Sequence, residues 1–211
     1  RLGLEEKLSE IKASSQKVSD ITTINLEAYQ HYFLGDELIN KLKFKQAQEE
    51  FKKAIALDPT FGLAYYRLAY AVDWERRQPA AKEYIEKAMT LLQRIPEKER
   101  YLVRAMNANL GKEEKAFEAG IAVLREMENV YPDDKEMLYN IGDWSYHLGK
   151  HKTALEYLER VLLTDPIHDR ALQHLTWTYR DMGKYDKMLE SAKRYETATG
   201  SEESYELIAQ A

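Results

Sequence analysis

The sequence predicts an all-α fold, a solenoid built from antiparallel helix pairs. The first observation is one spacing of small, large and proline residues that occurs twice, as Ala47-x3-Phe51-x2-Ala54-x4-Pro59 and Ala154-x3-Leu158-x2-Val161-x4-Pro166. The second is a large residue followed by glycine, 13 and 12 residues before each first alanine, at Leu34-Gly35 and Ile141-Gly142. Two short helices joined by a turn fit such a block, and the blocks bury their apolar faces by stacking.

The composition supports a helical array and excludes several classes of site. Among 211 residues, glycine occurs nine times and proline five times, which disfavours a turn-rich all-β fold. Because the chain has no cysteine, it has no disulfide, thiolate metal site or cysteine nucleophile. A net charge of −5 argues against nucleic-acid binding through broad phosphate neutralisation. No apolar stretch approaches the roughly 18 residues that a membrane span requires.

The repeated positions resemble those of the tetratricopeptide repeat, a unit of about 34 residues made of a helix, a turn and a second helix. This resemblance implies a right-handed superhelical solenoid with five repeats, at residues 28–61, 62–96, 97–134, 135–168 and 169–202. The motif positions of the first and fourth repeats are His31, Leu34, Gly35, Ala47, Phe51, Ala54 and Pro59, and Leu138, Ile141, Gly142, Ala154, Leu158, Val161 and Pro166. The second repeat keeps Tyr65, Leu68, Ala69, Ala81, Ile85 and Ala88 but lacks the proline.

The third predicted repeat departs most from this pattern. Gly111 lies 38 residues before Gly149, whereas Pro132 lies 34 residues before Pro166. Four extra residues are therefore expected, and we predict one added turn in the second helix, which keeps its apolar stripe in phase. Arg100 and Arg104 stand where apolar and small residues are expected.

Three Gly-Lys pairs, beginning at Gly111, Gly149 and Gly183, fall at one repeat position. A glycine there predicts a left-handed residue that ends the first helix of each pair. A phosphate-binding loop is the functional alternative, but none of the three has the earlier glycine that such a loop requires. We therefore interpret all three as helix caps.

Both ends lie outside the repeats. Residues 1–27 are predicted to contain an amphipathic helix, with Leu4, Leu8, Ile11 and Val18 at helical spacing, and a lead-in to the array. The segment Thr22-Thr23-x-Asn25-Leu26-Glu27-Ala28-Tyr29 resembles the lead-in to repeat arrays of bacterial signalling proteins, which follow an effector module. Residues 203–211 are predicted to form a capping helix or the first helix of a sixth repeat. Because the chain begins at Arg1, we expect a fragment or processed product.

The resemblance places partner contacts on the concave wall, which is lined by the first helix of each repeat. At one position of this wall tyrosine occurs in four consecutive repeats and glutamine in the fifth. The predicted partner-binding residues are Tyr29, Tyr32, Asp36, Tyr66, Tyr70, Asp73, Tyr101, Glu136, Tyr139, Asp143, Tyr146, Arg170, Gln173, Trp177 and Arg180. Two interpretations stay open: the tyrosines pack along the helices and bond neighbouring carboxylates without a ligand, or they line a groove for a peptide or helix.

Some members of the family hold the terminal carboxylate of chaperone tails with lysine and asparagine. Here Tyr32 and Asp36 occupy the two corresponding positions of the first repeat, and an aspartate repels an acidic tail. Ligands of basic or aromatic and apolar character are therefore favoured for the first four repeats. Arg170 and Arg180 offer positive charge for an acidic group in the fifth.

No catalytic residue, cofactor site or metal site is predicted. His147 and His151 have the spacing of a metal pair, but Gly149 lies between them at a predicted turn, so they are not expected to share a helix face. His31 occupies a packing position, and His168 and His174 lack a partner at ligand spacing.

The sequence therefore predicts a non-enzymatic scaffold for protein–protein interaction, which binds a partner peptide or helix in a tyrosine-lined concave groove. Nucleic acid and direct membrane insertion are not expected. One alternative is a homo-oligomeric array that assembles through terminal helices at 2–18 and 201–211. Another is a regulatory or sensory arm of a larger signalling protein. The compartment is left unassigned, with the cytoplasm favoured.

Overall fold

The described part of the chain is helical. The computed structural model describes residues 23–74, 78–110, 114–200 and 202–210, and within them it contains eleven α-helices, one short 3-10 helix and no strand. This confirms the predicted all-α fold. The chain divides into two compact units, Arg1–Gly111 and Lys112–Ala211, and each is described by itself.

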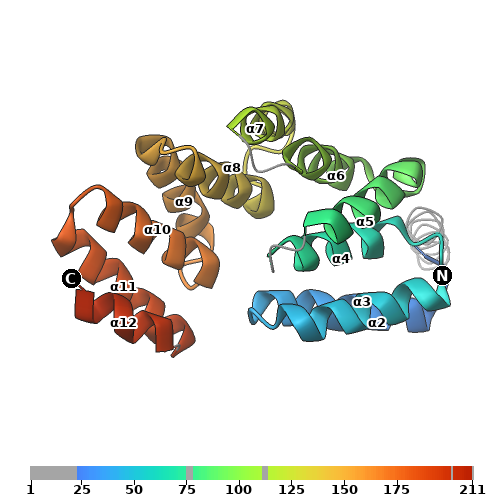
Figure 1. The fold of residues 1–211 in the computed structure, drawn as a ribbon, viewed down its shortest axis with the longest axis horizontal. Helices are drawn as coiled ribbons and strands as arrows, with labels where there is room; N and C mark the ends of the chain where they lie inside the picture. Colours follow the sequence, from blue (N-terminus) through green and yellow to red (C-terminus); the bar gives the residue numbers. More distant parts are fainter. Residues whose placement is uncertain (1–22, 75–77, 111–113, 201, 211) are drawn as a thin grey trace, which may run out of the picture. The chain divides into compact units, whose positions relative to one another are not determined.

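The first unit contains two antiparallel helix pairs followed by a further helix (Figure 1). Its elements are α2 (Leu26–Asn40), α3 (Phe44–Leu57), α4 (Gly62–Trp74), α5 (Gln78–Thr90), the 3-10 helix (Leu92–Arg94) and α6 (Glu97–Asn109). Helix α2 packs on α3 and α4 packs on α5, while α3 joins the pairs by packing on α4. The first helices also touch one another, α2 with α4 and α4 with α6, so they line one wall of this unit.

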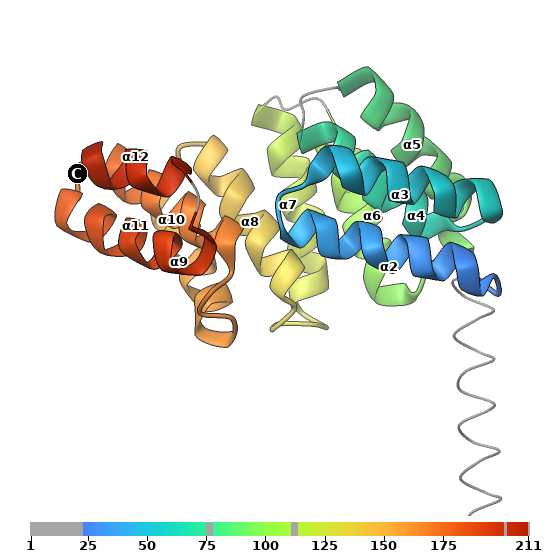
Figure 2. The same cartoon turned by 90° about the horizontal axis from the view of Figure 1, so that it is seen from below.

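The second unit repeats this arrangement. Its elements are α7 (Glu114–Glu128), α8 (Lys135–His147), α9 (His151–Thr164), α10 (Asp169–Asp181), α11 (Tyr185–Thr199) and α12 (Glu202–Gln210). The pairs are α8 with α9 and α10 with α11, and the first helices α8 and α10 are in contact. Helix α12 lies along α11 in both views (Figures 1 and 2), and Leu207 is buried against the end of this unit.

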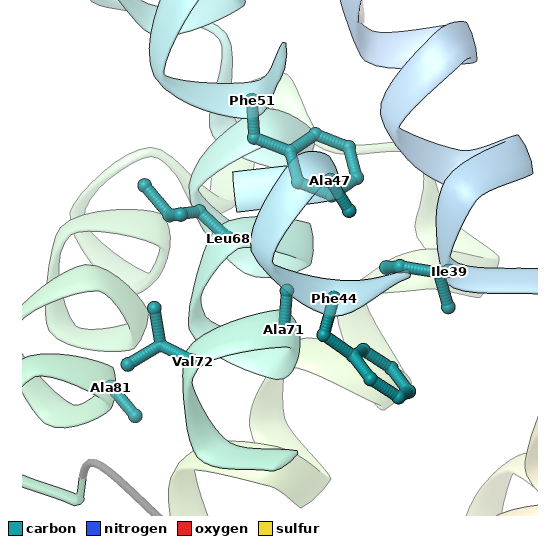
Figure 3. Close-up of a cluster of buried hydrophobic side chains, with 8 residues drawn as sticks. All are labelled: Ile39, Phe44, Ala47, Phe51, Leu68, Ala71, Val72 and Ala81. Atoms are coloured by element: carbon teal, nitrogen blue, oxygen red, sulfur yellow. The ribbon is translucent and has the colours of Figure 1, made fainter. Parts of the chain in front are cut away.

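In two helix pairs, a glycine in the first helix leaves room for a large side chain from the second helix of the same pair. A Cβ atom added to Gly35 would lie 2.6 Å from Cε1 of Phe51, and one added to Gly142 would lie 2.9 Å from Cγ of Leu158. These are the small and large residues of the repeated spacing, so the sequence pattern is explained by close approach of the paired helices. Figure 3 shows Phe51 within the apolar cluster of the first unit, together with Ile39, Phe44 and Leu68.

The turns within the pairs share one geometry. Gly149 and Gly183 both have φ near +67°, and the following lysines donate backbone hydrogen bonds to Ser145 and Tyr179, five residues back. This is a Schellman cap, so the helix-cap interpretation is confirmed for both glycines. Gly111 lies outside the described residues. Leu42 occupies the same position after α2 with φ 56°, the one described residue other than glycine in the left-handed region.

The extra turn predicted in the second helix of the third repeat stays a prediction, because residues 111–113, just before the described start of that helix, lie outside the described residues. Helix α7 spans Glu114–Glu128, 15 residues, compared with 14 in α9. Part of the additional length lies after the helix, because six residues, Asn129 to Asp134, separate α7 from α8, whereas four residues separate α9 from α10. A longer loop leaves the helix pairing intact, since closing a slightly longer loop costs little free energy.

The two arginines of α6 do not enter the core. Arg104 is exposed, and Nε of Arg100 donates a hydrogen bond of 2.6 Å to the Ile95 carbonyl oxygen just before the helix. The helix buries Leu102, Val103, Ala105 and Met106 instead. The predicted amphipathic helix at residues 2–18 lies outside the described residues.

Candidate partner-binding surface

The lead-in to α2 has a structural role. Asn25 caps α2, because its Oδ1 accepts from the Ala28 amide at 3.1 Å, while its Nδ2 donates to the Leu57 carbonyl oxygen at 3.2 Å. The Thr23 hydroxyl donates to Oδ2 of Asp58 at 2.6 Å. The polar residues of this motif therefore fasten the start of α2 to the end of α3, and an N-cap of this kind is worth about 1 kcal/mol.

Aromatic side chains gather where α2 and α4 meet. Tyr29 is 46% exposed, and its ring lies 6.1 Å from that of Tyr32, which is half-buried and packs on Phe61 at 5.0 Å. On α4, Tyr70 is half-buried and lies 6.2 Å from Trp74. The wall of the first unit thus presents aromatic rings that are partly covered and partly accessible.

The acidic charge predicted for this wall is paired within the protein. Oδ1 of Asp36 lies 3.0 Å from Nε of Arg67, and both side chains are only partly exposed. The Arg67 guanidinium also lies 5.3 Å from the ring centroid of Tyr66, which is buried. Asp36 therefore does not present an isolated negative charge to a ligand.

Tyr146 and Trp177 form the matching aromatic pair between α8 and α10. Their ring centroids are 6.1 Å apart, and both side chains are half-buried. The Tyr146 hydroxyl donates to Oδ2 of Asp181 at 2.9 Å. Burial and this hydrogen bond raise the pKa of Tyr146 to about 12, so its hydroxyl remains a donor across the physiological range.

A cluster of polar side chains also joins α8 to α10. Oδ1 of Asp143 lies 2.7 Å from Nε2 of His174 and 3.3 Å from Nε2 of His147. The buried Tyr139 meets His174 edge to face at 5.6 Å, and the Arg170 guanidinium lies 4.7 Å from the Tyr139 ring centroid. Arg170 is 8% exposed, so its charge is directed at Tyr139 rather than at solvent.

The structure separates the fifteen predicted contact residues into two groups. Five are buried, namely Tyr66, Tyr139, Asp143, Arg170 and Gln173. Ten are at least partly exposed, namely Tyr29, Tyr32, Asp36, Tyr70, Asp73, Tyr101, Glu136, Tyr146, Trp177 and Arg180. The buried group offers a partner little surface. This favours the packing interpretation for Tyr66 and Tyr139. They are two of the four tyrosines at the shared repeat position, here called the ladder tyrosines, which are Tyr32, Tyr66, Tyr101 and Tyr139.

The sequence interpretation missed the pairing of His174 with Asp143. It compared His147 with His151, which the structure places on separate helices, α8 and α9. The partner of Asp143 lies 31 positions along the chain, on the next first helix. The sequence could have suggested this pair if the first helices of neighbouring repeats had been aligned and their facing residues compared.

Among the residues that the structure describes, none of the helices is both long and apolar enough to cross a membrane.

Comparison with known families identifies two segments of the chain. The family model described as Tetratricopeptide repeat matches residues 31–61 and 135–168. These segments contain most of the α2–α3 pair and the whole α8–α9 pair, in which Gly35 and Gly142 receive Phe51 and Leu158.

A curated relative is similar to most of this chain. DnaJ homolog subfamily C member 3 of Mus musculus is 26% identical over 186 residues, which cover 81% of this chain and 36% of the relative. This chain therefore spans about a third of that relative's length.

Two solved structures share the helical-repeat fold. TTC0263, a thermophilic TPR protein of Thermus thermophilus, has a TM-score of 0.66 at 20% identity, covering 87% of this chain and 96% of that one. The APC/C hetero-tetramer Cut9-Hcn1 has a TM-score of 0.62 at 18% identity, covering 96% of this chain and 39% of that one.

Proposed function

Because this chain is a tetratricopeptide-repeat protein, and that fold supports scaffolds for protein–protein interaction, we propose that it binds a peptide or helix of a partner protein. The proposed contact residues are the ten partly exposed residues on the first helices, six in the first unit and four in the second, and each unit is considered by itself. The chain acts by binding, without catalysis of its own. The five-repeat division, from residue 28 to residue 202, is part of the same proposal.

The accessible aromatic side chains carry this proposal. Tyr29, Tyr32 and Tyr70 lie on the contacting helices α2 and α4, and Tyr146 and Trp177 lie on the contacting helices α8 and α10. Tyrosine and tryptophan provide large contact area at a low cost in conformational entropy, together with a polar group that bonds a partner. Each unit therefore supplies a contact area of its own.

The charge of the surface favours a partner rich in aromatic and apolar groups. Asp36 is paired with Arg67, and Arg170 is buried against Tyr139. Arg180 is the more accessible cation of α10, although its Nε lies 3.1 Å from Oδ1 of Asp181. Net charge attraction is therefore small, and contact area supplies most of the affinity.

The test compares single variants of the full chain as immobilised baits in lysate of its source organism. Tyr29→Ala, Tyr146→Ala and Trp177→Ala are the test variants, and Leu163→Ala on α9 is the matched control because Leu163 is 81% exposed. We expect at least one test variant to lose most of the partner retained by the control. Equal capture by all variants with unchanged melting temperatures would contradict the proposal.

Self-association is a second candidate function, favoured by apolar side chains at the first unit. Leu26 is 71% exposed and Phe33, two turns along α2, is 55% exposed. Exposed apolar residues on one helix face are typical of an interface between copies. Light scattering over a range of concentrations tests this: a Phe33→Ser variant should dissociate, and a wild-type chain that stays monomeric counts against assembly.

A regulatory arm of a larger signalling protein has weaker support. The lead-in motif that suggested it is accounted for by the contacts of Thr23 and Asn25 with the α3 end. Sequencing the whole reading frame that contains this chain tests this alternative. An effector module in that frame would support it, and a frame without one would contradict it.

A further inference from the structure

Three side chains with metal-binding atoms converge between α8 and α10. Asp143 and His147 lie one turn apart on α8, and His174 faces them from α10. One ligand atom from each residue lies within 4.8 Å of the other two. The carboxylate oxygen is 3.3 Å from Nε2 of His147 and 2.7 Å from Nε2 of His174.

A backbone hydrogen bond orients the His174 ring. Its Nδ1 lies 2.9 Å from the Arg170 carbonyl oxygen, which can only accept, so Nδ1 carries the proton and donates it. Nε2 is therefore the atom turned toward Asp143. Histidines that bind metals in proteins commonly donate the second ring N–H to a backbone carbonyl in this way, which fixes the tautomer of the ligand.

We propose that Asp143, His147 and His174 bind a divalent first-row transition-metal ion, with Zn²⁺ as the reference ion. Two imidazoles and one carboxylate favour zinc, copper or nickel over calcium and magnesium, which prefer oxygen ligands. This site goes beyond the proposed partner-binding function and does not depend on it. It also departs from the sequence prediction of no metal site.

The observed spacing is close to that of a tetrahedral zinc site. Ligand bonds of about 2.0–2.1 Å place neighbouring ligand atoms about 3.3 Å apart. The distance between Asp143 and His147 has this value, and the distance between Asp143 and His174 must lengthen by about 0.6 Å. The His147 side chain is 46% exposed, so a water molecule has access to the fourth position.

The carboxylate of Asp143 is enclosed by protein, because its side chain is only 13% exposed and that of His174 only 2% exposed. A buried anion between two imidazoles is suited to a divalent cation, which replaces the proton between Asp143 and His174. An ion pair without metal is the alternative that the experiment must separate.

Aromatic rings surround the three ligands. Phe117 stacks on His147 with ring centroids 5.6 Å apart, and Trp177 meets His174 at 4.7 Å. These rings cover part of each imidazole, which lowers the local polarity and strengthens the interaction of the ligands with a cation. They also place an indole beside the site, where its fluorescence reports a bound paramagnetic ion.

The experiment is calorimetric titration of the tag-free full chain with ZnCl₂. We expect one ion per chain with micromolar or tighter affinity. His147→Gln should weaken binding at least tenfold, and it tests the site without disturbing the core because the His147 side chain is 46% exposed. His151→Gln is the matched control, since His151 lies on the neighbouring helix outside the ligand cluster, and should bind as the wild type does.

Fluorescence quenching by Cu²⁺ gives a second measurement. Tryptophan emission should fall with saturation at one equivalent, because Trp144 and Trp177 both lie near the site, and His147→Gln should shift this quenching to higher copper concentration. The absence of saturable zinc binding, or equal affinity of the wild type and His147→Gln, would overturn the proposal and leave the ion pair alone. Equal weakening by His151→Gln would place the ion elsewhere.

Discussion

Helices α4 and α10 occupy equivalent places in their units but have different interiors. Each is a first helix that packs on the preceding pair and on its own second helix. The buried residues of α4 include no charged side chain. In α10, by contrast, Arg170, Gln173, His174, Thr176 and Thr178 are all buried.

This difference shows that the same arrangement of helix pairs can enclose either mainly apolar side chains or a set of buried polar and charged ones. In the first unit, the shapes of apolar side chains determine the fit, as with Gly35 and Phe51. In the second, buried polar groups require specific partners: Thr178 donates to the His174 carbonyl oxygen at 2.6 Å, and His174 meets Asp143. We therefore expect the second unit to depend more on pH and on charge-altering substitutions.

Removal of a ladder tyrosine should have the largest effect and should be similar in both units. Tyr66 and Tyr139 are each 1% exposed, so replacement by alanine leaves a cavity and should lower the free energy of unfolding by about 3–5 kcal/mol. Urea unfolding followed by circular dichroism measures this. Tyr29→Ala, at an exposed position, should cost less than about 1 kcal/mol. If either buried variant is as stable as the wild type, the packing interpretation fails.

Replacing an aspartate by asparagine should lower the free energy of unfolding by different amounts in the two units. Asp143→Asn removes one partner of a buried ion pair, and we expect a loss of about 3 kcal/mol. Asp36→Asn breaks the half-exposed pair with Arg67 and should cost about 1 kcal/mol or less. Both are measured by urea unfolding in chelator, so that metal ions do not contribute. Equal losses would mean that the two interiors respond alike.

Acid should destabilise the second unit through His168. This side chain caps α10 by accepting from the Ala171 amide at 3.2 Å, and burial, followed by the nearby charge of Arg170, lowers its pKa to about 4. The unfolded chain therefore binds this proton more readily, and stability falls as pH drops from about 6.5 toward 4.

Between pH 7 and pH 5 the loss from His168 should be about 2 kcal/mol. The control is His168→Asn, because asparagine keeps a helix cap but does not titrate. Unfolding curves at each pH should show a smaller decline for this variant. An identical decline in the two proteins would assign the acid sensitivity to other groups.

The turn residues should give the smallest effect. An alanine Cβ at Gly149 meets no atom within 4 Å, so Gly149→Ala tests the left-handed backbone alone and should cost about 1 kcal/mol. Leu42→Gly relieves the same strain in the first unit but removes a side chain that packs on the apolar cluster. The two contributions oppose each other, and we expect a net change within about 0.5 kcal/mol of zero in thermal or urea unfolding. A gain or loss well above about 1 kcal/mol would show that one contribution dominates.

Residue spacing along the chain predicts the helix pairs and the close approach of the two helices within a pair. The spacing of Gly35 with Phe51, and of Gly142 with Leu158, is set by residues one helix apart, and the glycine caps act within a single turn. Such local constraints are visible in one sequence because small residues and left-handed glycines have few alternative uses.

The accessibility of the polar and aromatic side chains, by contrast, depends on how neighbouring helix pairs pack. Tyr66 and Tyr32 share a repeat position, yet one is buried and the other half-exposed, because their surroundings come from different neighbouring helices. Likewise, the pairing of Asp143 with His174 depends on how α8 and α10 face each other. Helical periodicity gives the face on which a residue lies, but burial and partner choice depend on the next helix, whose rotation and distance are set by packing.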